Sequence, residues 1–484
     1  MGPTRTTSSR RRTLLAIPLT GVIAGALSIV LMGQVGQPDA QEIPGPRGDT
    51  SYSPVVITSA DFDEAVERMS AEKDEIMARQ RDLLEMRYDL SDRPMAEATM
   101  SGGKPVQDGV RVRLPEGVDS WDQLNEMSAE EIREQGLFPR GFLPLPHPNH
   151  PEGGMVFPDH HIEDILEQEG RDLERFDLEF DLPEHLLPEF PPPMFLTTRP
   201  DLGDVSQGQL VTIKNFQDLF EGILNSKQLE GMRLLVTPFP QQQFNSTHDR
   251  RSLEPHQGVT CFDCHANGHT NASTHLAGDP RPQETRRRID TPTLRGMNVQ
   301  MIFGSQRAMK SAEDFTEFEQ RGAYFDGDIV QAAKKGVNML ERGSQVHFMG
   351  EVQNILGFPP APKLDPMGYL RPELATEQEL AGEELFHGTA QCATCHPPPH
   401  FTDNSMHDLQ VYRFHDAVEI NGRLAVQEGL TKTFPLRGIK DSPTYFHDGR
   451  LLTLADTVEF FNLILELGLA EDEKEALVAY MLTL

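Results

Sequence analysis

Basic residues, cysteine and tryptophan are scarce in this sequence of 484 residues. It contains 44 Lys and Arg against 75 Asp and Glu, and its formal net charge at pH 7 is −31. Most of such a surface would repel a polyanion, which excludes non-specific binding to DNA, RNA or anionic lipid. The length suits two or three domains and excludes a miniprotein, and a hydrophobic fraction of 37% is enough for a sizeable core.

The amino terminus has the pattern of an export signal. Arg10, Arg11 and Arg12 directly precede an apolar run from Leu14 to Met32. This run is long for a cleaved signal and just long enough to span a bilayer, so cleavage and membrane anchoring both remain open. We expect residues 1–40 to be a signal peptide or an inner-membrane anchor, and the rest of the chain to be periplasmic or otherwise exported.

Residues 41–240 form an acidic, proline-rich stretch. Between residues 61 and 89 apolar side chains recur at helical steps, which predicts one long amphipathic helix with a mainly solvated surface. Further on, proline runs such as Pro191–Pro193 exclude long helices and central strands. We therefore expect a wrapping extension of loops and short helices. Without any fixed ligand spacing, its histidines are interpreted as surface polar residues rather than metal ligands: His147, His150, His160, His161 and His185.

Three sequence blocks then occur twice in the same order, which indicates a duplicated module. The first copy consists of Cys261–His265 (CFDCH), Thr291–Gly296 and Phe303–Phe318, and the second of Cys392–His396 (CATCH), Thr433–Gly438 and Phe446–Phe461. In the last block this alignment pairs Phe303 with Phe446 and Phe318 with Phe461. We assign residues 241–365 and 366–484 to the two modules.

Each copy begins with the pattern Cys-x-x-Cys-His. Two thiols one helical turn apart can add to the two vinyl groups of haem while the adjacent histidine reaches the iron, which is the pattern of c-type haem attachment. Zinc sites and redox dithiols or disulfides also use Cys-x-x-Cys and are the alternatives. Two copies behind an export signal favour two covalent haems, held by Cys261, Cys264, Cys392 and Cys395, with His265 and His396 as the proximal iron ligands.

The opposite face of each iron decides the chemistry, because a haem with two strong ligands only passes electrons whereas an open position permits reaction. His256, His269 and His275 lie near the first motif in sequence. His269 follows His265 too closely to cross to the other face. His275 comes after a short flexible stretch and can loop over, so we predict it as the second ligand of the first iron, with a surface loop histidine as the alternative.

Residues from about 241 to 484 resemble the bacterial dihaem cytochrome c peroxidase and MauG family. The resemblance rests on both CxxCH motifs, the Leu-Arg-Gly blocks, Tyr445–Arg450 (YFHDGR) and the closing segment Glu475–Met481. It implies a mainly α fold, in which two cytochrome c-like helical haem domains follow the loop-rich extension. It also implies an iron-containing oxidoreductase, a peroxidase in which an electron-transfer haem feeds a haem that reacts with hydrogen peroxide. The electrons would come from a small cytochrome c or a cupredoxin, and a calcium ion often lies between the domains.

Three features depart from that family. Its distal ligand to the second haem, Met or Tyr, corresponds here to Phe461, which has no donor atom. We expect Phe461 to point inward on the apolar face of a helix capped by Thr453, so that the second haem is either five-coordinate or ligated by Met406 or His407. The tryptophan that the family places between the haems is absent, since the single tryptophan is Trp121. No glutamate aligns with the family's catalytic one, and Glu351, which lies near that point, is expected to be an exposed helix charge.

Peroxide cleavage also needs a group that moves a proton between the two oxygens. His447 and His407 are the candidates around the second haem, as His275 is at the first. The resemblance gives His447 an alternative, structural role near the haem edge. By position, the implied calcium ion would use Asp290 and carbonyl groups near Ser442 and Thr444. Besides a peroxidase, the sequence allows a MauG-like oxidase or oxygenase of an organic or protein substrate, or a non-catalytic electron carrier.

Overall fold

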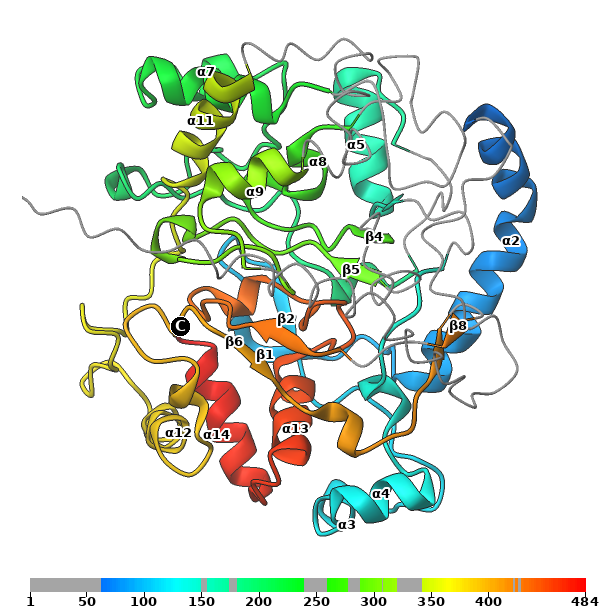
Figure 1. The fold of residues 1–484 in the computed structure, drawn as a ribbon. Coiled ribbons are helices and arrows are strands. Elements are labelled where there is room, and N and C mark those ends of the chain that lie inside the picture. Colours follow the sequence, from blue (N-terminus) through cyan, green and yellow to red (C-terminus); the bar gives the residue numbers. More distant parts are fainter. Residues whose placement is uncertain are drawn as a thin grey trace, which may run out of the picture. The chain divides into compact units, whose positions relative to one another are not determined.

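The computed structural model describes residues 62–148, 155–173, 181–238, 259–276, 288–306, 308–319, 342–420, 423–424 and 428–484 (Figure 1). The expected signal or anchor, residues 1–40, and His256 lie outside these ranges. The described part is mainly helical, with small sheets of two or three strands. None of its helices combines the length and the apolar character needed to cross a bilayer.

The long helix expected near residues 61–89 is α2 (Phe62–Arg87). Ile76, Met77, Gln80 and Leu84 are buried along one face at three- and four-residue steps. In the last turn Arg87 donates from Nη1 to the carbonyl oxygen of Pro144 at 3.2 Å. The second half of α2 is therefore packed against the protein, which corrects the expectation of a mainly solvated helix.

Short elements separated by loops follow α2, as the proline content predicted. They are β1 (Pro94–Thr99), β2 (Pro105–Gln107), α3 (Trp121–Asn125), α4 (Ala129–Gln135), β3 (Met155–Val156), α5 (Asp159–Glu169), α6 (Phe216–Phe220) and α7 (Ser226–Leu235). Local signals set their limits. Helix α4, for example, begins at a capping box between Ser128 and Glu131 and ends at Gly136, whose φ of 66° is left-handed.

Two apolar cores each combine this extension with one repeat. The first core joins Met194, Leu196 and Phe220 to Phe262, Leu294 and Phe303. The second core joins Leu124, Ile132 and Phe142 to Phe386, Phe460 and Tyr480. The boundaries at residues 240 and 365 stay predictions, but the extension shares its apolar cores with the repeats.

Close helix pairs build each core (Figure 1). Helix α7 packs against α11 (Arg342–Gln353), and α12 (Glu377–His387) packs against α14 (Glu471–Met481). Both contacts depend on glycine. A Cβ atom at Gly231 would lie 1.9 Å from the carbonyl oxygen of Phe348, and one at Gly382 would lie 1.9 Å from that of Ala476. A side chain at either position would force the helices apart.

The two repeats also contain the same succession of local structures. In the first, α8 (Cys261–Cys264) precedes β4 (Thr274–Leu276), β5 (Arg288–Asp290) and α9 (Ala312–Phe318); in the second, a short 3₁₀ helix (Cys392–Thr394) precedes β6 (Met406–Asp408), β9 (Leu430–Lys432) and α13 (Leu454–Ile464). Strand β4 pairs with β5, and β6 pairs with β9, both antiparallel. Left-handed Gly296 and Gly438, with φ of 74° and 73°, follow the Leu-Arg pairs. The duplicated sequence pattern thus corresponds to a duplicated structure.

These elements shift the alignment of the last block by one residue. Isolated bridges join Phe303 to Met309 and Tyr445 to Leu451. Ser311 caps α9 and Thr453 caps α13, each accepting from the backbone N–H three residues later. Tyr445, not Phe446, is therefore equivalent to Phe303, and Phe460, not Phe461, is equivalent to Phe318. Each aromatic residue in the second copy has an aromatic neighbour, so matching by residue type alone chose the wrong one.

The start of α13 is bonded to the extension as well. The carboxylate of Asp456 accepts the backbone N–H groups of Arg111 at 2.7 Å and of Val112 at 2.9 Å. It also accepts from the backbone N–H of Thr453 at 3.0 Å. One buried side chain thus completes the cap of α13 and holds the extension against the second repeat.

Candidate functional site

The first Cys-x-x-Cys-His motif lies on α8. Thr260 caps this helix, and the Asp263 carboxylate returns to the backbone N–H of Thr260 at 2.7 Å. Arg171, from the extension, donates to both oxygens of Asp263 at 2.8 Å. Cys261 and Cys264 are free thiols. The cysteine pair is therefore held on a short, capped and ion-paired helix.

Burial sets the charge state of this motif. It lowers the pKa of His265 to about 4, so the imidazole is neutral at pH 7. It raises the pKa of Cys261 to about 12 and that of Cys264 well above its usual value. A neutral imidazole is the form that binds a metal ion. Two cysteines and the adjacent histidine fit thioether-linked haem, and the same residue types also occur in zinc sites.

The second motif has the same cysteine and histidine spacing as the first but a different local structure. The 3₁₀ helix Cys392–Thr394 has no side-chain cap and follows Gln391 in left-handed geometry. The Nδ1 atom of His396 lies 2.8 Å from the carbonyl oxygen of Phe401. Because a carbonyl only accepts, Nδ1 carries the proton and Nε2 keeps a lone pair for a metal. Burial also lowers the pKa of His396 and raises that of Cys392 to about 12.

The candidates for the other face of the first iron are placed differently. His269 has both ring nitrogens engaged, with Nδ1 2.7 Å from Thr293 Oγ1 and Nε2 2.9 Å from the carbonyl oxygen of Asp441. This excludes His269 as a ligand, as expected. The backbone of His275 lies in β4 between Met155 and Ile289, but its side chain lies outside the described part of the structure. Its role as a second ligand stays a prediction.

Phe461 is partly buried, whereas its neighbour Phe460 is fully buried. Leu454 and Val458 of α13 are also buried, but Leu465 after it is 44% exposed, so the apolar face of α13 is centred on Phe460 rather than on Phe461 as expected. Phe461 packs at the edge of the second core.

Of the two acid–base candidates at the second motif, His407 and His447, His407 is the better placed. It lies in β6 opposite Thr431, and His275 occupies the same central position in β4 opposite Ile289. His407 Nε2 lies 2.7 Å from Asp403 Oδ2. Ligand atoms of His407, Asp403 and Cys395 all lie within 4.8 Å of one another. His407 is therefore beside the second motif and oriented by a carboxylate.

His447 belongs to a buried charged cluster. Its Nε2 lies 3.5 Å from Glu428 Oε1, and Arg450 forms ion pairs with both Glu428 and Asp448. Burial opposes ionisation of Asp448, but Arg450 outweighs it and lowers the pKa of Asp448. Asp448 also accepts the N–H of Leu145 at 2.8 Å. These contacts fit the structural role that the sequence offered as the alternative for His447.

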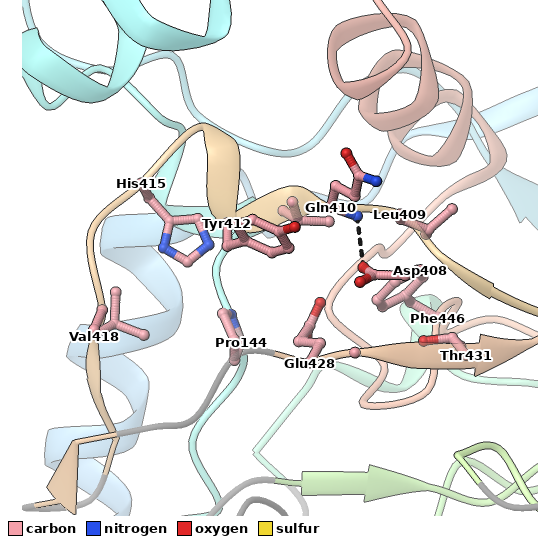
Figure 2. A pocket seen from close by; sticks show the side chains of 13 residues that line it. Pro144, Asp408, Leu409, Gln410, Tyr412, His415, Val418, Glu428, Thr431 and Phe446 are labelled. Carbon is pink, nitrogen blue, oxygen red and sulfur yellow. Dashed lines mark hydrogen bonds between the residues drawn. The ribbon is translucent and has the colours of Figure 1, made fainter.

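A pocket adjoins this cluster (Figure 2). Glu428 and Phe446 belong to its wall, and so do Tyr412 and His415 from the segment after β6. Figure 2 also shows Asp408 on this wall, where it accepts the N–H of Gln410 at 2.9 Å. The lining residues include none from either Cys-x-x-Cys-His motif. The pocket is therefore separate from both motifs, and Pro144 of the extension contributes to its wall.

Two further predicted residues, Asp290 and Glu351, have clear positions. Asp290 is 8% exposed, and its Oδ1 has no hydrogen-bond partner among the described residues. Burial raises its pKa well above the usual value, so a cation would be a suitable partner, although calcium itself stays a prediction. Glu351 lies on the surface of α11, 3.5 Å from His347, as expected for an exposed helix charge.

Trp121 is distant from the motifs in sequence but close to the second repeat in space. Its ring centroid is 5.6 Å from that of Phe142, and Phe142 is 5.2 Å from Phe460. Phe460 is in turn 5.4 Å from Phe461. A row of aromatic rings therefore leads from the extension to α13.

Several solved structures are similar to this chain, including the following two. One is a chain of "Kuenenia stuttgartiensis Hydrazine Synthase Pressurized with 20 bar Xenon", with 19% identity over 57% of this chain and 93% of that chain and a TM-score of 0.36. The other is a MauG-like protein associated with microbial copper homeostasis, with 16% identity over 54% of this chain and 88% of that chain and a TM-score of 0.37. No protein-family model matches the sequence, and no curated protein does. We transfer no function from these likenesses.

Sequence reasoning missed two features of the extension: the burial of two of its histidines and the contact that Arg171 makes with the first motif. His147 and His161 are fully buried, which corrects their interpretation as surface residues. His161 Nδ1 lies 2.6 Å from the amide nitrogen of Asn271, and burial lowers its pKa to about 3. Arg171 contacts Asp263 across 92 residues of sequence. No local sequence pattern identifies such pairs, although an aspartate that is buried inside a Cys-x-x-Cys motif needs a positively charged partner.

Proposed function

We propose that this chain is an exported dihaem c-type cytochrome oxidoreductase that reduces hydrogen peroxide with electrons from a small redox protein. One observation carries the proposal. Two copies of the same structural unit each contain a Cys-x-x-Cys-His motif, followed by a paired strand and a capped helix. Haem, when bound, would supply the iron redox chemistry. Cys261, Cys264, Cys392 and Cys395 would hold it, with His265 and His396 as axial ligands.

The residues around the second motif support reaction rather than electron transfer alone. Phe461 stands where the resemblance puts the distal ligand and offers no ligand atom, so the second iron would have an open face unless another residue occupied it. Asp403 orients His407 at 2.7 Å, which gives a base of the kind that moves a proton during peroxide cleavage. His407 is assigned this acid–base role, and His447 a structural role in the buried cluster beside Glu428.

A second candidate function is oxidation of an organic or protein substrate that docks on the extension. The row of rings from Trp121 to Phe461 favours it, because such a row connects the extension to α13 of the second repeat. High-valent iron that accumulates with peroxide in the absence of an external reductant would support this function over the peroxidase.

The deciding experiment uses the full chain made in a host competent for cytochrome maturation. We expect two haems per chain, at least one high-spin EPR signal, and oxidation by peroxide in stopped flow much faster than that of free haem. A colourless protein would overturn haem attachment. Two low-spin haems unaltered by cyanide or carbon monoxide would indicate a plain electron carrier. The variant Cys392→Ser/Cys395→Ser should retain one haem, with Cys261→Ser/Cys264→Ser as its matched counterpart.

A further inference from the structure

The two motifs differ in how the rest of the protein holds them. At the position of Asp263 in the first motif, the second motif has Thr394, which is exposed. Asp263 is 1% exposed and closes the cap of α8. The second motif has no side-chain cap at all. Only the first motif therefore contains a buried charge that needs a partner.

That partner comes from the extension. Arg171 donates to both carboxylate oxygens of Asp263, and its Nε lies 2.5 Å from Glu169. Glu169 in turn accepts the N–H of Ile213 at 3.2 Å. A bidentate arginine–carboxylate pair fixes the orientation of the carboxylate as well as its distance, which a lysine cannot do. The orientation of α8 is thus set from outside the repeat.

A second set of contacts holds the end of the same motif. The Asn271 amide nitrogen donates to the carbonyl oxygen of Asp263 at 2.8 Å and to His161 Nδ1 at 2.6 Å. The orientation of this amide is fixed, since its oxygen accepts the N–H of Ser273 at 3.0 Å. His161 Nδ1 must therefore accept, which leaves its proton on Nε2 and excludes it as an iron ligand through that atom. His161 is a support for the motif.

We propose that Arg171 is a positioning residue for the first motif, so that the extension controls haem attachment and axial geometry at Cys261, Cys264 and His265 but not at the second motif. This inference rests on the proposed function, because it assumes that haem is attached. It gives the acidic extension a role inside the site, in addition to any role in docking. The second motif serves as an internal control within the same molecule.

The test is Arg171→Met in the full chain, with haem-bearing peptides of the two motifs quantified separately by mass spectrometry. We expect the ratio of first-site to second-site haem to fall about tenfold or more, because the variant leaves a buried carboxylate without its partner. The matched control is Arg199→Met, which removes an exposed arginine–carboxylate pair with Asp201 of similar length. An unchanged ratio in Arg171→Met would overturn the proposal.

The double variant Arg171→Met/Asp263→Asn keeps the test decisive if the single variant does not fold. It removes both charges, so folding should recover while the first haem alone shows an altered EPR signal. A first-haem signal identical to that of the unmodified protein would contradict a positioning role. If the unmodified protein carries no haem, the proposed function fails. The positioning role of Arg171 is then tested by maleimide labelling of the cysteines. Arg171→Met should in that case accelerate labelling of Cys261 and Cys264 but not of Cys392 and Cys395.

Discussion

Arg295 of the first repeat and Asp441 of the second form a buried ion pair, with Nη1 and Oδ2 2.7 Å apart. Asp441 also accepts the N–H of Ser101 at 2.9 Å, so the extension joins the same contact. Among the described residues, the equivalent arginine of the second repeat, Arg437, donates to the carbonyl oxygens of Leu484 and Pro359 and to no carboxylate. Within the described part of the chain, the two equivalent arginines therefore have different kinds of partner.

Asp441→Asn should lower the free energy of unfolding at pH 7 by about 3–5 kcal/mol, because it leaves Arg295 buried without its counter-ion. Burial opposes the charge of Asp441, but Arg295 outweighs it and keeps the pKa below its ordinary value. The stabilisation is thus complete above the unfolded pKa of about 3.9 and is lost as pH falls through the lower folded value. Urea titrations at pH 7 and pH 3 measure both effects. Asp201→Asn, at an exposed pair, should change little.

Lys432→Met should stabilise the protein at pH 6. Burial lowers the pKa of Lys432 to about 7, although its Nζ lies 4.3 Å from the centroid of Phe434 and donates to Gln300. The unfolded chain binds this proton up to about pH 10.4, so the cost is largest below pH 7 and disappears as pH rises towards that value. We expect a gain of roughly 2–4 kcal/mol at pH 6 and none near pH 10.5. Equal gains at both values would contradict the assignment.

His407→Ala should slow peroxide reduction by roughly 10²-fold or more, since a positioned acid–base group contributes at least this much. Asp403→Asn should reduce kcat in the same direction but less, because it leaves the imidazole in place and removes only its orientation. Asp416→Asn, at an exposed ion pair with Arg133, is the control. Steady-state kinetics with a chemical reductant measure all three. Wild-type rates in His407→Ala would assign the proton transfer to another group.

Phe461→Met tests whether the proposed second haem has an open ligand position at Phe461. A thioether at this point would provide the donor atom that phenylalanine lacks, so the second iron should change from high-spin to low-spin and lose most of its peroxide reactivity. EPR of the oxidised protein reports the change. Phe460→Met is the matched control, because that ring is fully buried one position away. A low-spin second haem already present in the unmodified protein would refute the prediction.

Calcium should stabilise the protein through Asp290. The partnerless Oδ1 and the raised pKa mean that, without a cation, stability falls as pH rises through the folded pKa of this group. Calcium at a hundred times its Kd should add about 2.7 kcal/mol. Asp290→Asn should abolish this gain and be more stable than the unmodified protein in EDTA. Calcium-independent melting of the unmodified protein would rule out the site.

Much of the site follows from local sequence, since the Cys-x-x-Cys-His motifs, the repeat and the Thr453 cap of α13 are all patterns within a few residues. The helix near residues 61–89 was equally readable from its spacing. These features are encoded locally because backbone hydrogen bonds and caps involve near neighbours in the chain.

The remaining features depend on contacts that no local pattern specifies. The pairing of Arg171 with Asp263 and the burial of His161 arise from packing between distant segments. The one-residue error at Phe461 has a different origin, because two adjacent aromatic residues satisfy the same pattern. Only the bridge between Tyr445 and Leu451 and the cap at Thr453 distinguish them.

The bonds from Arg111 and Val112 to Asp456 span 345 and 344 residues. Loop closure over such separations is slow, and partners this far apart cannot meet until nearly the whole polypeptide has been synthesised. Arg111 and Val112 can therefore form these bonds only once α13 is present. The folding of the extension is consequently coupled to that of the second repeat, and the last helices to be made determine when the first ones can settle.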